Sequence, residues 1–179
     1  LRSHGITKDT KKFRQKDVGQ WHYEQHELGF NYRMTDISAS LGLSQLKRLD
    51  KIIRTRNDQL DNYKRLLKDT EITILDVPRN CRTAGHLAVA LLGSADRIRH
   101  KRIFSEMREH GIGVQLHYIP VHLQPYYRNL GFKEGDFYNA ESYALRALSL
   151  PIYPGLKHKD QIRVSRTLEI LTSKYKSSE

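Results

Sequence analysis

An asparagine and an arginine lie in a polar segment just before the longest amphipathic stretch of the chain. Asn31 and Arg33 precede Thr35 and Asp36, either of which can cap a helix that begins there. The first turn of a helix has unpaired N–H groups and a partial positive charge, so it favours an anionic ligand. An amide donor and a guanidinium beside that turn suit a phosphate or a carboxylate. The segment is therefore a candidate anion site.

Other kinds of catalytic or metal site have weaker support. His22 and His26 are four residues apart, but they lie outside any clear helical pattern, and no cysteine or third histidine completes a zinc shell. Cys81 has no nucleophile motif around it, and the chain has no glycine-rich phosphate loop. His117 and His122 lie at the predicted end of a strand and in the loop that follows, where site residues gather, although a pair of histidines there is usually structural. We therefore expect no metal site.

Helical and strand patterns alternate along the chain and must position these groups. From Thr35 to about Asp69, apolar residues at spacings of three, four and seven predict one long helix. At ~1.5 Å per residue this helix would be roughly 50 Å long, so we expect it to bridge two domains or subunits. The later pattern predicts strands at 72–77, 87–92, 112–118 and 148–150, and helices from Ser94 or Asp96 to Gly111, over 136–147 and at the C-terminal end.

Composition and charge limit the class of protein. The chain has 179 residues, 38% of them hydrophobic, with no run near the ~20 apolar residues that span a bilayer and no leader-like start, so we expect a soluble, cytoplasmic protein. Lys and Arg outnumber Asp and Glu by 31 to 20, which favours anionic partners. The basic residues are spread widely, so solvated helix faces are the favoured explanation for them.

Four ordered motifs resemble those of one enzyme family. Residues 29–46 resemble the G-x-N-Y-R-M-T-D-I-x-A-x-L-G-x-x-Q-L signature of the DegT/DnrJ/EryC1/StrS sugar aminotransferases. Residues 1–5, 111–126 and 148–154 resemble further elements, the last of them the pattern L-S-L-P-x-Y-P. Residues 21–25 and 117–122 look most like the branch that aminates a UDP-linked 4-keto-6-deoxy sugar at C4, as in pseudaminic acid synthesis.

The resemblance implies a fold and a division of the chain. It implies an α/β (α+β) architecture, the C-terminal part of a fold-type I pyridoxal phosphate-dependent aminotransferase, with a long bridging helix and a small sheet covered by helices. Residues 1–69 would be a remnant of the large domain with the inter-domain helix, and residues 70–179 the small C-terminal domain. The Schiff-base lysine would lie before Leu1, and none of Lys8, Lys11, Lys12 and Lys16 matches it, so this part alone is expected to be inactive.

The resemblance also implies roles for particular residues. Asn31 matches an asparagine that reaches the phosphate of pyridoxal phosphate across a dimer interface, while Arg33, His117 and Tyr118 would bind substrate. The cofactor would be bound by the complete homodimeric enzyme, with a nucleotide sugar and glutamate as substrates, and not by this part alone. From the residues themselves, a surface ion pair remains open for Arg33 and a core aromatic role for Tyr118.

Two other functions compete with the aminotransferase. The net charge and Tyr126-Tyr127-Arg128 suggest a noncatalytic basic domain that binds nucleic acid by stacking, but no motif of a known binding module is present. Alternatively, the chain is a partner domain for another subunit that supplies the lysine. On the preferred interpretation we expect neither nucleic acid nor a membrane as a partner.

Overall fold

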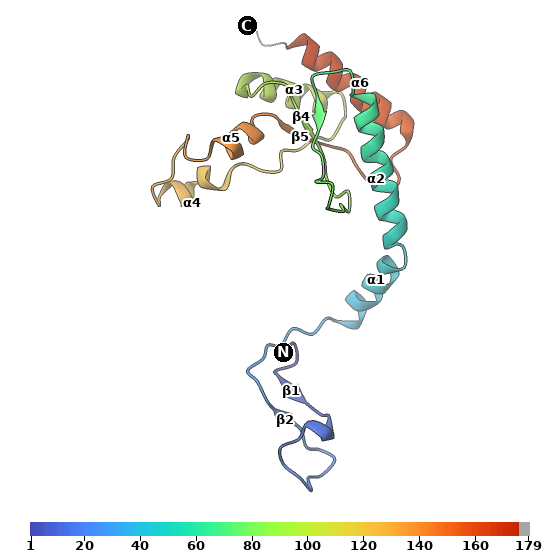
Figure 1. Cartoon of the computed structure of the whole chain (residues 1–179), viewed down its shortest axis with the longest axis vertical. Coiled ribbons are helices and arrows are strands. Elements are labelled where there is room, and N and C mark those ends of the chain that lie inside the picture. Colours follow the sequence, from blue (N-terminus) through green and yellow to red (C-terminus); the bar gives the residue numbers. More distant parts are fainter. Residues whose placement is uncertain (176–179) are drawn as a thin grey trace. The chain divides into compact units, whose positions relative to one another are not determined.

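The structure, a computed structural model, describes residues 1–175. The chain divides into two compact units, Leu1–Leu49 and the part that begins at Asp50 (Figure 1). The division falls inside the stretch that the sequence pattern predicts to be one helix. No helix among the described residues is long and apolar enough to cross a membrane.

The first unit contains a small antiparallel hairpin. Strand β1 (Ile6–Thr7) pairs with β2 (Glu24–Gln25), and the 3-10 helix η1 (Thr10–Lys12) lies in the loop between them. Two glycines allow the chain to close on itself here. Gly5 has φ +69°, and a Cβ on it would lie 2.0 Å from the carbonyl oxygen of Glu27, while a Cβ on Gly29 would lie 2.2 Å from the nitrogen of Gly5. Glycine is therefore required at both positions.

The predicted long helix is two helices. Helix α1 (Asp36–Leu46) is capped by Thr35, whose hydroxyl accepts a hydrogen bond from Ser38 N at 3.3 Å, as the capping pattern predicts. It ends in a turn at Lys47 and Arg48, and α2 (Leu49–Leu66) follows. The last turn of α1 tightens through a 3-10 type hydrogen bond from Arg48 N to Gln45 O. The expectation of a single continuous helix was wrong.

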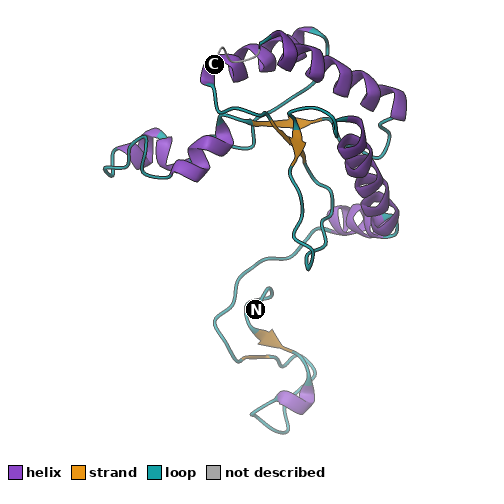
Figure 2. Ribbon diagram, turned by 45° about the horizontal axis from the view of Figure 1, so that its top comes forward, coloured by secondary structure: helices purple, strands orange, loops and turns teal. Residues whose placement is uncertain are grey.

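The second unit is built on a three-stranded antiparallel sheet in the order β3–β4–β5. Figure 2 shows the strands in orange among the purple helices. β3 (Thr73–Ile74) pairs with β4 (Ala88–Leu91), and all four residues of β4 pair with β5 (Ala147–Leu150). The helices α2, α3 (Arg97–Glu109) and α6 (His158–Lys174) gather around this sheet. The short elements η2 (Val121–Leu123), α4 (Pro125–Arg128) and α5 (Tyr138–Ala144) extend beside it.

The core of this unit is formed by apolar side chains from the sheet and the three long helices. Alternate residues of β4 and its extension enter it, as strand geometry requires. The stripe predicted along the long helix is buried only in its second part, because Leu46 and Leu49 are exposed whereas Leu60, Tyr63 and Leu67 are buried. The other core residues are Ile72, Ile74, Ala88, Ala90, Leu92, Ile103, Met107, Ile112, Val114, Leu148, Leu150, Leu156, Val164, Leu168 and Leu171.

The predicted strand at 112–118 is an extended segment with a single bridge. Ile112 and Val114 are buried, as the alternation predicts, but only Gln115 exchanges backbone hydrogen bonds with Ser149, at 3.3 and 2.7 Å.

The two ends of helix α3 agree with the capping residues predicted from the sequence. Asp96 caps it by accepting from the N–H groups of residues 98 and 99, and Gly111 follows it with φ +70°.

Candidate functional site

Asn31 and Arg33 lie together in the first unit, just before α1. The backbone of Asn31 forms an isolated bridge with Ser3, and the flanking Tyr32 N donates to Arg2 O at 2.8 Å. This pairing fixes the backbone from which both side chains project. The Arg33 Nε donates to the Asn31 Oδ1 at 2.9 Å, and both residues are exposed. Arg33 forms no ion pair with any residue in the range 1–175, so the surface ion pair left open by the sequence is absent there.

The bond between these two side chains determines what the pair offers to a ligand. An amide has one acceptor atom and two N–H donors, and the acceptor of Asn31 is used by Arg33. Its Nδ2 has no hydrogen-bond partner within residues 1–175, so it is available as a donor. The remaining N–H groups of Arg33 carry positive charge beside it. The pair therefore presents donors and a cation, the combination that a phosphate accepts.

His117 and Tyr118 lie together in the second unit. His117 is half-buried, and its Nδ1 lies 2.8 Å from the Ser149 hydroxyl. The Tyr143 hydroxyl donates to the backbone carbonyl of His117 at 2.9 Å, and burial raises the pKa of Tyr143. The Tyr118 ring meets the His117 ring edge-on at 4.8 Å between centroids and is 70% exposed, so it is not a core aromatic. Two buried or half-buried hydroxyls thus hold His117 in place.

His122 is buried, and its contacts with Glu141 and Phe137 give it a structural role. It is 7% exposed, its Nε2 lies 2.7 Å from a Glu141 oxygen, and its ring packs against Phe137 at 4.8 Å between centroids. The hydrogen bond from His122 lowers the pKa of the Glu141 carboxyl, which also accepts from Gly135 N at 2.9 Å. This pair ties the η2 segment to α5.

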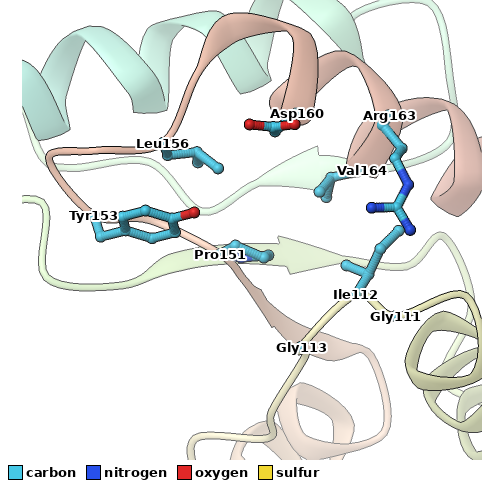
Figure 3. Close-up of a pocket in the computed structure, with 9 residues that line it drawn as sticks. All are labelled: Gly111, Ile112, Gly113, Pro151, Tyr153, Leu156, Asp160, Arg163 and Val164. Atoms are coloured by element: carbon cyan, nitrogen blue, oxygen red, sulfur yellow. The ribbon is translucent and has the colours of Figure 1, made fainter.

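A hollow of about 490 Å³ lies between the segment after α3 and the first turns of α6 (Figure 3). Its charged groups are Asp160 and Arg163 on α6, and the Arg163 guanidinium donates to the carbonyl of His110. Tyr153 and Pro151, from the L-S-L-P-x-Y-P element, form the opposite wall. None of the residues predicted from the sequence to bind a ligand lines it.

The structure adds residues that the sequence pattern did not single out. Ser149 and Tyr143 contact His117, yet they are 32 and 26 residues away along the chain. The predicted strand at 148–150 was the only signal for Ser149. Glu24 is a second addition, because it accepts hydrogen bonds from the backbone of Arg14 and Gln15 and lies against His22 and His26.

His22 and His26 are the two residues that the sequence analysis considered as zinc ligands. Within residues 1–175 no group of three or more His, Cys, Asp or Glu side chains is arranged to hold a metal ion. His22 and His26 both lie against Glu24, at 3.4 and 2.6 Å, and no further ligand joins them there.

Comparison with known proteins identifies close relatives in bacteria and archaea. The chain is 38% identical to the uncharacterized protein MJ1066 of Methanocaldococcus jannaschii, covering 97% of this chain and 45% of that protein. It is 37% identical to the spore coat polysaccharide biosynthesis protein SpsC of Bacillus subtilis, over 89% and 42%. It is 31% identical to the UDP-4-amino-4,6-dideoxy-N-acetyl-beta-L-altrosamine transaminase of Campylobacter jejuni, over 98% and 44%. The chain thus spans less than half the length of these relatives.

Solved structures confirm the fold. Spr1654 of Streptococcus pneumoniae, a candidate sugar aminotransferase solved in its PMP form, matches with a TM-score of 0.82 and 28% identity, over 97% of this chain and 43% of that one. PseC of Helicobacter pylori, an aminotransferase of pseudoaminic acid biosynthesis, matches with a TM-score of 0.78 and 25% identity, over 97% and 44%. The mixed helices and small sheets are those of part of a fold-type I aminotransferase. The model of the DegT/DnrJ/EryC1/StrS aminotransferase family matches residues 1–169, and the chain therefore belongs to this family.

Proposed function

We propose that this chain forms the C-terminal portion of a pyridoxal phosphate-dependent nucleotide-sugar aminotransferase. The complete enzyme would move an amino group from glutamate to a UDP-linked 4-keto-6-deoxy sugar. The family membership and the Campylobacter relative support this proposal. Because no lysine here matches the one that carries the cofactor, we expect the isolated chain to be inactive.

The observation that carries the proposal is the paired Asn31 and Arg33. Both residues are exposed, and the bond at 2.9 Å occupies the amide acceptor of Asn31 while its two N–H donors remain free. A phosphate needs donors of this kind, so the residues present fit the phosphate end of the cofactor. Bound pyridoxal phosphate supplies the electron-withdrawing ring through which an amino group is exchanged. Asn31 would hold the phosphate, with Arg33 fixing the amide or contacting an anionic group of the substrate.

His117 and Tyr118 would contact the sugar in this proposal. The Nδ1 of His117 lies against Ser149, so its Nε2 is the ring nitrogen left to meet a ligand. The phenol of the exposed Tyr118 adds a donor and an acceptor close to it. Sugar hydroxyls need hydrogen-bond partners of this type, and the fixed position of His117 would favour one orientation of the sugar ring.

A homodimer is the assembly that we propose. Helix α1 buries none of its residues, and the apolar side chains of Ile37, Leu41 and Leu46 are 85%, 63% and 62% exposed. Exposed apolar surface on one helix is typical of an interface. The cofactor phosphate that Asn31 contacts would belong to the neighbouring subunit.

A chimera tests the function. Residues 1–175 of this chain would replace the matching segment of the Campylobacter transaminase, and transfer of the amino group from glutamate to the UDP-linked keto sugar would be measured by mass spectrometry. We expect transfer by the chimera and none by the isolated chain supplied with cofactor and glutamate. A chimera that is folded by circular dichroism and retains the cofactor, but aminates no nucleotide sugar, would contradict the proposal.

A further inference from the structure

A second pocket, of about 320 Å³, lies in the second unit among α3, α5 and the segment around His117 and Tyr118. Small-molecule sites are hollows of roughly 300–1,000 Å³ with mostly apolar walls and a few polar groups. Six apolar residues line this one, so it has room for one small apolar ligand. These residues are Leu116, Ile119, Pro120, Leu123, Ala144 and Leu145.

Four charged side chains also line the pocket, and three of them have partners in the protein. Arg97 forms an ion pair with Glu134 at 2.8 Å, and a Glu141 oxygen lies 2.7 Å from the Nε2 of His122. Lys101 is exposed, and its ammonium group forms no hydrogen bond or ion pair with any residue in the range 1–175. A ligand that meets Lys101 must therefore supply an acceptor, and an ionised acceptor gives the stronger, charge-assisted hydrogen bond.

Hydrogen bonds between elements fix the walls of this pocket. His100, which lines it, donates through Nε2 to the carbonyl of Ala147 at 2.9 Å and so fastens α3 to β5. The Tyr143 hydroxyl donates to the carbonyl of His117 at 2.9 Å and so fastens α5 to the segment that follows α3. Because these walls are already held in place, less entropy is lost when a ligand binds between them.

We propose that this pocket binds an apolar monocarboxylate, such as a straight-chain alkanoate, with its carboxylate on Lys101 and its chain among the apolar side chains. A doubly charged phosphate is disfavoured, because the carboxylates of Glu134 and Glu141 line the same pocket and repel the additional charge. Nothing in this binding depends on the proposed transfer reaction, since none of the lining residues is assigned to the cofactor or to the sugar.

Isothermal titration calorimetry of the 179-residue chain with butanoate, hexanoate and octanoate tests the class of ligand. We expect one site per chain, with affinity rising about fourfold for each added CH₂. Octan-1-ol should bind about tenfold more weakly than octanoate, because the charge-assisted hydrogen bond is lost. Octylamine should bind more weakly still, because its cation meets Lys101.

Two results of this titration would overturn the proposal. Octanol that binds as tightly as octanoate would show that the pocket takes an uncharged ligand and that Lys101 plays no part. Octanoate that binds no more tightly than butanoate would show that the apolar walls contribute nothing to affinity.

Variants locate the binding in this pocket. Lys101→Met should weaken octanoate about tenfold and leave octanol within about twofold of its original affinity, because only the contact with the carboxylate is removed. Leu123→Ala should weaken both ligands about fivefold, because apolar contact area is lost. The control is Lys159→Met, which removes an exposed lysine of α6 outside the pocket and should change neither affinity by more than about twofold. Equal losses from Lys101→Met and Lys159→Met would contradict the proposal.

NMR spectra show where octanoate binds, and circular dichroism verifies that each variant is folded. The amide signals of Leu116, Leu123 and Leu145 should shift on titration, together with those of His117 and Tyr118, which lie between Leu116 and Ile119 in the chain.

An aromatic hollow of about 380 Å³ on the same unit is the competing location for an apolar ligand, and Tyr127, Phe132 and Phe137 line it. Shifts confined to those three residues would overturn the assignment to the pocket beside Lys101. If octanoate binds as expected but the chimera transfers no amino group, the proposed reaction fails and this pocket stands. If the chimera is active and octanoate does not bind, only this inference fails.

Discussion

The Arg33 guanidinium holds the Asn31 amide by its only acceptor, with 2.9 Å between Nε and Oδ1. An amide group without a hydrogen-bond partner can rotate by half a turn, so that its oxygen and its nitrogen exchange positions. The bond to Arg33 selects the orientation in which the two N–H donors of Asn31 remain free. Arg33 is therefore a positioning residue for Asn31, whatever anion the pair meets.

This relationship predicts the effect of changes at both residues on the cofactor. In the chimera, Asn31→Ala should weaken pyridoxal phosphate about tenfold, because one hydrogen bond to a charged phosphate is lost. Asn31→Asp should weaken it further through repulsion, and Arg33→Met should weaken it about threefold by freeing the amide. Cofactor titration followed by absorbance gives these affinities. Arg48→Met, in the turn after α1, is the control for loss of one exposed arginine; cofactor affinity as high in Arg33→Met as in this control would refute the positioning role.

Local features of the fold were predictable from the sequence. The cap at Thr35, the cap at Asp96 and the left-handed glycine at 111 were confirmed, because each depends on a side chain and its nearest backbone. The buried strand at 88–91 was also confirmed, because a continuous apolar run of this length is typical of a strand that is buried on both faces.

Features that depend on distant contacts were not predictable. The break at Lys47 and Arg48 has no glycine or proline to signal it, and the apolar stripe continues through it. The hydroxyl beside His117 comes from Ser149, 32 residues later, and only the register of the fold brings the two together. The family motif identified His117 as a candidate, but it contained no information about what orients the ring.

Ser149 and Ser165 form a matched pair of buried serines for a stability test. The Ser149 hydroxyl bonds His117, whereas the Ser165 hydroxyl has no partner within the described residues. Ser149→Ala should lower the free energy of unfolding by about 1 kcal/mol, because it leaves a half-buried imidazole nitrogen unpaired. Ser165→Ala should raise it by about 0.5 kcal/mol, since it removes an unsatisfied group from a helix and alanine is the better helix former.

Urea unfolding of the two variants measures these changes. The NMR signals of the His117 ring nitrogens add a readout specific to orientation, because Ser149→Ala should abolish any fixed tautomer while Ser165→Ala should leave it unchanged. Equal destabilisation by both substitutions would mean that the hydrogen bond between Ser149 and His117 makes no specific contribution to the free energy of unfolding.

The buried Arg99 joins three separate parts of the second unit. It is 4% exposed, and it donates to the carbonyls of Thr172 and Tyr175 at 3.1 and 2.6 Å, to the Ser94 hydroxyl at 3.0 Å and to the Glu71 carboxylate. It thereby caps the end of α6 with a cation. Arg99→Met should lower the free energy of unfolding by about 3 kcal/mol, because several buried acceptors lose their donor.

Arg97, two residues earlier on the same helix, supplies the control. It forms an ion pair with Glu134 at 2.8 Å, but both side chains are more than half exposed. Exposed pairs of this kind contribute little, so Arg97→Met should cost no more than about 0.5 kcal/mol. Denaturation in urea compares the two variants, and a loss of similar size from both would show that the buried network adds no stability.

The Glu24 carboxylate makes the loop between β1 and β2 sensitive to acid. Hydrogen bonds from the backbone of Gln15 and Arg14, and then from His26, lower the pKa of Glu24 from 4.5 to about 2. Because the folded pKa lies below the unfolded value, the stabilisation is complete above pH 4.5 and is lost as the pH falls toward about 2. The amide shifts of Arg14 and Gln15 should therefore titrate with a midpoint near 2, and Glu24→Gln should remove that titration. A midpoint at the ordinary value of a glutamate would mean that these amides do not hold the carboxylate, and Glu24 would then not anchor the loop to β2.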